Sequence, residues 1–411
     1  MTGKIQRAFA LSLLTFSFAA AASAQSGSVR PRRVNPPQSS STQTSDGGAL
    51  SSSDDAGPRI GSANRSSSNI NTPGAGGASG DTSRAFSLFQ QKQYAAAARE
   101  AKQVAAANPN NAEAWKIAGF SEMNLKQYAE AADDLRRALD LQRREGKEDT
   151  NTADALAQAL VFTEKFEEAL PLLVAATTRK GAQADAAMLY YRGLSEYQTN
   201  KKADAERSFN AAVKANAKDA RSLYYLGQIA FERNDMDATI AALNRATLND
   251  AQIASAWQLL TIAYLRRAGS ASVKARADAD YLNAVRAGES LVRARSDAAT
   301  NTLLGQALIG AGQMTRAATV LERAAADKEA RGTTFYLLGF TYSRAKNYPK
   351  AITALERAAQ LSPDDANVYR ELGYAYEISK QYAKALEAYE KGARLAPDDE
   401  YFRQSVERVK Q

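Results

Sequence analysis

From residue 83 to the C-terminus, apolar positions recur with the spacing of amphipathic helices. Phe335, Leu338, Gly339 and Tyr342 fall at i, i+3, i+4 and i+7, so they form one stripe of a helix. A facing stripe follows on the next predicted helix, at Ala351, Leu355 and Ala358. The pattern predicts a pair of antiparallel helices in which Gly339, placed opposite Ala351, permits a close approach.

The same pattern repeats along the chain. Residues 332–365 align with residues 366–399, because Gly339 and Gly373 lie 34 positions apart and the flanking aromatic, Leu and Pro-Asp-Asp positions coincide. A fixed period of this length indicates stacked supersecondary units. Tracking one small residue in each first helix gives nine repeats, at Ala85, Gly119, Ala157, Gly193, Gly227, Thr261, Gly305, Gly339 and Gly373.

These quoted motifs resemble the tetratricopeptide repeat (TPR) family of helical-hairpin solenoids. The resemblance implies an all-α, right-handed superhelical solenoid of about nine helix-turn-helix units that binds other proteins. We expect the solenoid over residues 83–399, with an insertion around 268–286 in the sixth repeat, and a capping helix over residues 400–411.

The residues expected to build the repeats are small residues at helix contacts and aromatic residues in the core columns. Their predicted role is structural. They are Trp115, Gly119, Gly193, Gly227, Trp257, Gly305, Gly339, Ala351, Gly373 and Ala385.

Two segments of different composition precede the repeats. Residues 1–24 have a charged start, an apolar stretch and Ala22-Ser-Ala24 before Gln25, which predicts a secretory signal peptide, with an uncleaved anchor as the alternative. Residues 25–82 are rich in Ser, Gly and Pro and predict a disordered linker. No later stretch is apolar enough to cross a membrane, so we expect an exported chain, periplasmic or secreted.

Composition narrows the chemistry. The chain has no Cys and no His, which excludes thiol nucleophiles, imidazole bases and ordinary zinc sites. Its net charge of +8 is spread among acidic residues, so no nucleic-acid partner is expected. Arg30, Arg32 and Arg33 could make a weak contact with an anionic surface. No catalytic residue, metal or cofactor is expected, and the chain is predicted not to be an enzyme.

The candidate partner-binding residues lie one position beyond the core stripe. By resemblance to TPR proteins this first-helix face lines a concave groove, and its tyrosines and arginines are common interface anchors. The alternative is that some of these aromatic residues pack between repeats. The candidates are Lys116, Phe120, Tyr190, Tyr197, Tyr224, Phe231, Tyr336, Phe340, Arg344, Arg370 and Tyr374.

Two further features, Lys116 in the candidate groove and the basic residues of the sixth-repeat insertion, can each be interpreted in two ways. Chaperone-binding TPR domains grip a terminal carboxylate with Lys and Asn in this stripe; here Lys116 matches, but Phe120 replaces the Asn. In the insertion, Arg266 and Arg267 could contact an acidic patch, or the segment could be a plain helical extension.

The sequence therefore predicts a non-enzymatic scaffold or adaptor of the cell envelope that docks a partner segment, a peptide or a helix of an envelope component. The alternative function is a glycan-binding protein associated with polysaccharide export, because tyrosine-rich grooves can stack sugar rings.

Overall fold

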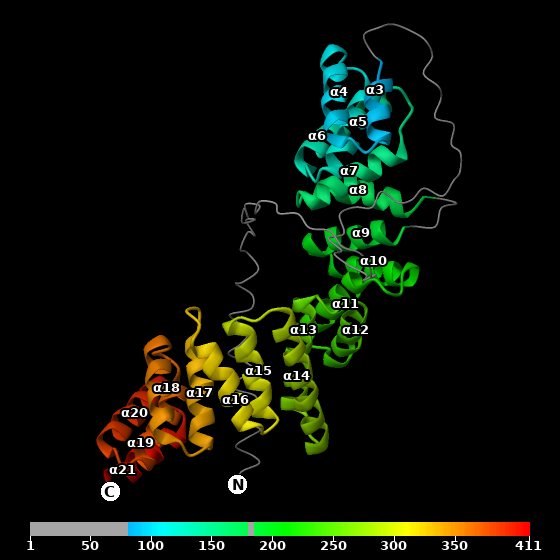
Figure 1. The fold of residues 1–411 in the computed structure, drawn as a ribbon. Coiled ribbons are helices and arrows are strands. Elements are labelled where there is room, and N and C mark those ends of the chain that lie inside the picture. The colour runs from blue at the N-terminus through cyan, green and yellow to red at the C-terminus, as the bar shows by residue number, and fades with distance from the viewer. Residues whose placement is uncertain (1–80, 180–184) are drawn as a thin grey trace, which may run out of the picture. The chain divides into compact units, whose positions relative to one another are not determined.

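The structure is a computed structural model that describes residues 81–179 and 185–411. All regular elements in this part of the chain are helices, nineteen in number. They form nine consecutive antiparallel pairs followed by a single terminal helix (Figure 1), which confirms the predicted all-α solenoid of helix-turn-helix units. The predicted signal peptide and almost all of the predicted linker lie outside the described residues.

The first helices of the pairs are α3 (Ser83–Gln90), α5 (Ala112–Asn124), α7 (Thr150–Phe162), α9 (Ala186–Gln198), α11 (Ala220–Glu232), α13 (Ala254–Ser270), α15 (Ala298–Gly310), α17 (Gly332–Arg344) and α19 (Ala366–Ile378). The second helices are α4 (Tyr94–Ala107), α6 (Tyr128–Arg144), α8 (Phe166–Thr177), α10 (Lys202–Ala215), α12 (Met236–Asn249), α14 (Lys274–Ala294), α16 (Met314–Ala325), α18 (Tyr348–Leu361) and α20 (Tyr382–Leu395). The terminal helix is α21 (Glu400–Lys410).

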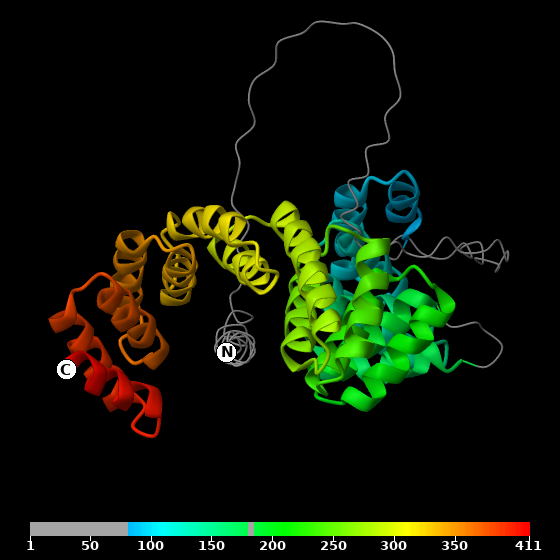
Figure 2. The same cartoon turned by 90° about the horizontal axis from the view of Figure 1, so that it is seen from below.

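The repeats divide into two compact units, with the boundary between Ser222 and Leu223 in α11. Within the N-terminal unit α3, α5, α7 and α9 contact one another in sequence, in addition to the contacts inside each pair. Within the C-terminal unit α13, α15, α17 and α19 do the same (Figure 2). The first helices of each unit therefore form one continuous layer, and the second helices pack onto it.

The glycine column sets the distance between the two helices of a pair. An ideal Cβ at Gly339 would lie 2.5 Å from Leu355 Cγ and 3.2 Å from the Ala351 carbonyl oxygen. The side chain facing Gly339 is thus Leu355 rather than the predicted Ala351, which is buried one helical turn earlier. Other pairs repeat this contact sixteen residues apart: Gly119 with Leu135, Gly193 with Phe209, Gly227 with Leu243, Gly305 with Leu321 and Gly373 with Tyr389.

Asn and Asp begin many of the first helices, as the Pro-Asp-Asp motifs predict. The Asp365 side chain accepts a hydrogen bond from the Asn367 backbone N–H at 3.0 Å, and Asp399 accepts one from Tyr401 at 3.1 Å. Asn111 does the same for Ala114. Each contact satisfies a backbone donor that the first helical turn leaves free.

Most hairpins turn through a residue with left-handed backbone geometry. Two of the residues with positive φ are glycines, Gly146 and Gly312. The others carry a side chain, which disfavours this conformation. The non-glycine residues with positive φ are Lys92, Lys126, Glu164, Asn200, Asn234, Lys346 and Lys380.

The insertion in the sixth pair lengthens both helices. α13 has 17 residues and α14 has 21, compared with 13 in α19 and 14 in α20. Arg267 of α13 contacts both its own hairpin and the pair before it, since its Nε lies 2.9 Å from Asp280 Oδ2 of α14 and its Nη1 lies 2.6 Å from Asp237 Oδ1 of α12. The inserted residues thus extend both helices, and Arg267 pairs with acidic residues of this chain.

Trp115 and Trp257 are half-buried rather than enclosed in the core. The indole N–H of Trp115 donates to the Pro109 carbonyl and that of Trp257 to the Ala251 carbonyl, each at 2.9 Å. Both rings therefore tie the start of a first helix to the turn before it, which supports their predicted structural role.

α21 covers the end of the last pair. Phe402 is fully buried and its ring lies directly against Gly392 of α20. Arg370 of α19 stacks on this helix, with its guanidinium 4.9 Å from the Tyr401 ring centre. Within residues 81–179 and 185–411, no helix combines the length and hydrophobicity needed to span a bilayer.

Replacing Gly339 with Ala should lower the free energy of unfolding by up to about 2 kcal/mol. The new methyl group overlaps Leu355, which costs about 1–3 kcal/mol, and the gain in helix propensity offsets about 1 kcal/mol of that cost. Urea unfolding followed by circular dichroism measures the change.

The matched control is Gly288→Ala in α14, where the nearest atom to the new Cβ is the Leu304 Cδ1 methyl at 3.1 Å. Both substitutions gain the same helix propensity, about 1 kcal/mol. Equal stability of the two variants would contradict the close-approach argument.

Candidate functional site

The first-helix layer of the C-terminal unit brings together Arg344 of α17 and Tyr374 of α19. The Arg344 guanidinium lies 4.6 Å above the Phe340 ring, and its Nη2 is 3.4 Å from Glu371 Oε1. Tyr374 lies edge-to-face with Tyr348, with 6.4 Å between ring centres. Burial, and then the neighbouring Tyr348, raise the pKa of Tyr374. This arrangement presents a stacked cation and a tyrosine pair on adjacent repeats.

Arg370 also projects from α19, but its contacts are with the terminal helix. Its Nη2 pairs with the Asp399 carboxylate, and its guanidinium stacks over Tyr401 and Phe402. Arg370 therefore fastens α21 to the last pair, a structural role that the sequence did not predict.

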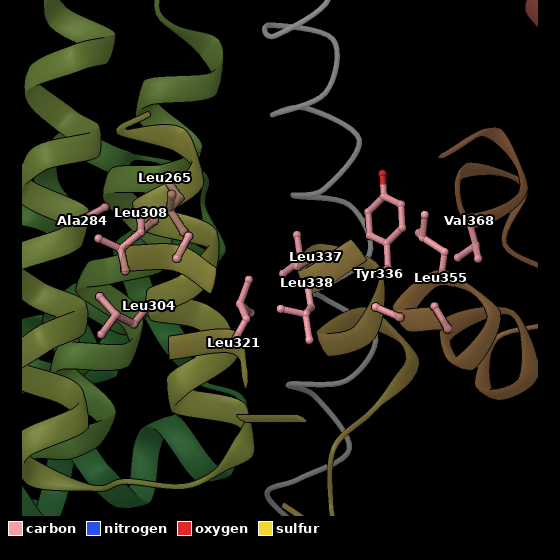
Figure 3. Close-up of a cluster of buried hydrophobic side chains, with 14 of the residues drawn as sticks. Leu265, Ala284, Leu304, Leu308, Leu321, Tyr336, Leu337, Leu338, Leu355 and Val368 are labelled. Carbon is pink, nitrogen blue, oxygen red and sulfur yellow. The ribbon is translucent and has the colours of Figure 1, made fainter. Parts of the chain in front are cut away.

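Four of the aromatic residues predicted to contact a partner are buried. Tyr336 retains 4% of its exposure and Tyr190 retains 8%. Phe231 and Phe340 are buried to the same degree. Figure 3 shows Tyr336 beside Leu337 and Leu338, with its hydroxyl pointing away from them. In the structure these rings pack, which is the alternative that the sequence left open, and burial raises the pKa of Tyr336 well above its usual value.

The remaining predicted residues are half-buried: Lys116, Phe120, Tyr197 and Tyr224. The Lys116 ammonium is 3.1 Å from Asp149 Oδ2 and 3.3 Å from Glu113 Oε2. Burial alone would lower the pKa of Lys116, but the two carboxylates raise it. Lys116 is thus already neutralised within the repeat.

Sequence reasoning missed Glu371 and Tyr348. Glu371 lies next to Arg370 in sequence but is buried between α17 and α19, and this burial raises its pKa against the opposing effect of Arg344 and Arg370. Tyr348 is the first residue of α18, so it comes from the second-helix layer, outside the stripe that supplied the candidates. An acidic residue inside an apolar first-helix stripe is the signal that could have identified Glu371.

A second missed feature links consecutive pairs. The Tyr376 hydroxyl donates to Glu356 Oε1 at 2.5 Å, and the Tyr342 hydroxyl donates to Glu322 in the same way one repeat earlier. In both cases the second-helix residue lies twenty positions before the first-helix residue of the next pair. The same separation joins Asn244 to Tyr264 and Lys102 to Glu122. We call these contacts polar pins.

No group of three or more metal-binding side chains occurs in the part of the chain that the structure describes.

Removing one pin should loosen the junction between the last two pairs. Tyr376→Phe deletes the hydroxyl that donates to Glu356, so we expect a loss of about 1.5–3 kcal/mol, as for a hydrogen bond to a charged group. Hydrogen exchange of the α18 and α19 amides measures this loss of stability.

Tyr382→Phe, on a side chain that is 53% exposed, is the control and should leave the exchange of these amides unchanged. The same loss in both variants would rule out a role for the pin.

Comparisons with known proteins agree with this architecture. Two tetratricopeptide repeat family models match, one over residues 330–398 and one over residues 83–146, 155–206 and 190–256. No curated protein sequence gives a significant match.

Several solved structures are similar to parts of this chain. YrrB, described as a TPR protein with an unusual peptide-binding site, is 19% identical, with a TM-score of 0.42 over 49% of this chain and 99% of its own. A tetratricopeptide repeat protein from Parabacteroides merdae is 14% identical, with a TM-score of 0.40 over 64% and 98%. MamA from Desulfovibrio magneticus RS-1 is 20% identical, with a TM-score of 0.38 over 44% and 96%.

The family models together match more than half of the chain, and their repeats coincide with the helix pairs of the structure. The chain therefore belongs to the tetratricopeptide repeat family, whose repeats indicate a protein-protein interaction scaffold.

Proposed function

We propose that this chain is a non-enzymatic scaffold of the cell envelope that docks a segment of a partner protein on the first-helix layer of its C-terminal unit. The observation that carries the proposal is the placement of Arg344 and Tyr374 on the adjoining first helices α17 and α19, where the charge of Arg344 acts on the Tyr374 hydroxyl. Ile378, one turn after Tyr374, is 46% exposed. Arginine and tyrosine supply strong contacts at interfaces, and the apolar Ile378 side chain adds area to bury.

The surroundings of these residues favour binding over chemistry. Phe340 lies beneath the Arg344 guanidinium, and Glu371 lies beside it, so the cation is oriented before a partner arrives. Such preorganisation lowers the entropy cost of association. The helical layer is a rigid support on which an extended or helical segment could lie along successive repeats.

Photo-crosslinking in the native envelope tests this face. A photoreactive residue at position 378, where the Ile378 side chain is 46% exposed, should capture one discrete partner. Arg344→Ala combined with Tyr374→Ala should reduce this capture about tenfold or more, the effect of losing interface anchors. Circular dichroism checks that the variant folds.

The matched control places the same photoreactive residue at Gln360, an exposed position on α18 in the second-helix layer. Equal capture from positions 378 and 360, or capture that survives the double substitution, would contradict the proposed face. Capture of oligosaccharide without protein would favour the glycan alternative.

Export forms part of the proposal and is supported by the sequence pattern of residues 1–24. N-terminal sequencing of the protein purified from cells should find a chain that begins at Gln25, because Ala22-Ser-Ala24 provides the small residues that a signal peptidase requires. A mature protein that retains Met1 to Ala24 would refute cleavage at this site.

A further inference from the structure

Two acidic side chains are buried together in the second helix pair. Glu122 of α5 and Asp134 of α6 keep only 2% and 5% of their exposure. Both face the ammonium group of Lys102, which comes from α4 of the first pair. Lys102 Nζ contacts Glu122 Oε1 directly and lies 3.4 Å from Asp134 Oδ2. One cation therefore serves two buried carboxyl groups.

This arrangement is short of hydrogen-bond donors when both carboxyl groups are ionised. Glu122 Oε2 and Asp134 Oδ2 are buried and accept no hydrogen bond in the described part of the chain. A proton on Glu122 removes the shortage, because the protonated group can donate to Asp134 while Lys102 neutralises the remaining charge. Lys102 itself is 44% exposed at its side chain, so the cluster borders solvent.

The fourth repeat provides an internal comparison. Glu196 and Ser208 occupy the positions of Glu122 and Asp134, counted from Gly193 and Gly119. There the Ser208 hydroxyl donates to Glu196 Oε2 at 2.6 Å, and Arg192 Nε donates to Oε1 at 2.8 Å. Both carboxylate oxygens of Glu196 therefore accept hydrogen bonds, whereas Glu122 Oε2 accepts none in the described part of the chain.

We propose that Glu122, Asp134 and Lys102 form a proton-dependent lock between the first two helix pairs, closed when the two carboxyl groups share one proton and loosened when both are ionised. Lys102 and Glu122 form the polar pin between the first two helix pairs, so the lock acts directly on that junction.

The direction of the effect follows from the ionisation of Glu122. Burial first, and then Asp134, raise the pKa of Glu122 from 4.5 to about 7, although Lys102 opposes the shift. Burial also raises the pKa of Asp134. Between pH 4.5 and about pH 7, Glu122 holds a proton in the folded chain and releases it in the unfolded chain. The stability of this junction therefore falls as the pH rises from 4.5 to about 7.

Other charged groups near α5 have partners of their own. On α5 itself, Glu113 and Lys116 pair with each other. On α6, the charge of Arg137 acts on Asp134. On α3, Arg84 lies 3.6 Å from Glu100, and on α7, Asp154 pairs with Arg179.

The composition of the chain makes the test clean. The sequence contains no histidine, the side chain whose ordinary pKa lies near neutrality. Hydrogen exchange of the full chain, corrected for intrinsic rates, should show protection of α4, α5 and α6 falling by at least about tenfold between about pH 5 and about pH 8. The exchange is read in these helices alone, because Glu371 and Asp365 also have raised pKa values in the C-terminal unit.

Two substitutions complete the experiment. Glu122→Gln supplies an amide donor to Asp134 at every pH, and Asp134→Ser recreates the fourth-repeat arrangement, so both should abolish the pH dependence. The α9 and α10 amides of the unmodified chain, around Glu196, should show none in any case.

Protection in α4 to α6 that does not change with pH, or a pH dependence that persists in both variants, would overturn the lock. If the variants fail to fold, carbon-13 NMR of glutamate carboxyl groups in the unmodified chain decides. The lock requires one glutamate to titrate near neutrality, and a Glu122 signal that titrates near the ordinary glutamate value would refute it.

Discussion

Six of the nine described helix pairs share one close contact, in which a second-helix side chain lies directly against the backbone of a first-helix glycine. With Leu355 over Gly339 and Tyr389 over Gly373, the two helices approach as far as their backbones permit. Because this contact recurs at a constant separation of sixteen residues, successive pairs have nearly the same thickness and can stack in register. The continuous first-helix layer, and any surface on it, follows from that uniformity.

Much of this architecture could be predicted because it is local in sequence. Helix faces follow from periodicity, and the caps at Asp365 and Asp399 involve backbone groups only two residues away. The register between the two helices of a pair, that is, which residues lie opposite each other, is harder to predict from sequence. Ala351 and Leu355 lie on the same face one turn apart, and periodicity cannot determine which of them stands opposite Gly339. Packing of the larger side chain decides it.

The candidate site was predicted less completely for a related reason. Tyr336 and Phe335 are one residue apart, so they point about 100° from each other, and both stripes are partly apolar. Which stripe remains open depends on how one pair stacks on the next, through contacts between residues such as Arg344 and Glu371, 27 positions apart. Arg344 and Glu371 meet only because α17 and α19 adjoin. The polar pins were accessible from sequence, since Glu322 and Tyr342 recur as Glu356 and Tyr376 one period later.

Most of the hairpin turns contain a residue whose backbone conformation is energetically unfavourable. Left-handed geometry at a residue with a side chain is unfavourable by roughly 1–2 kcal/mol, and glycine would avoid it. Yet seven such turns carry Lys, Glu or Asn, and all of these side chains are exposed. In a stack of similar helix pairs the hairpin turns form a row, along which two molecules could associate side by side. Charged and amide groups at the turns keep that row hydrated, so some conformational stability is exchanged for colloidal solubility.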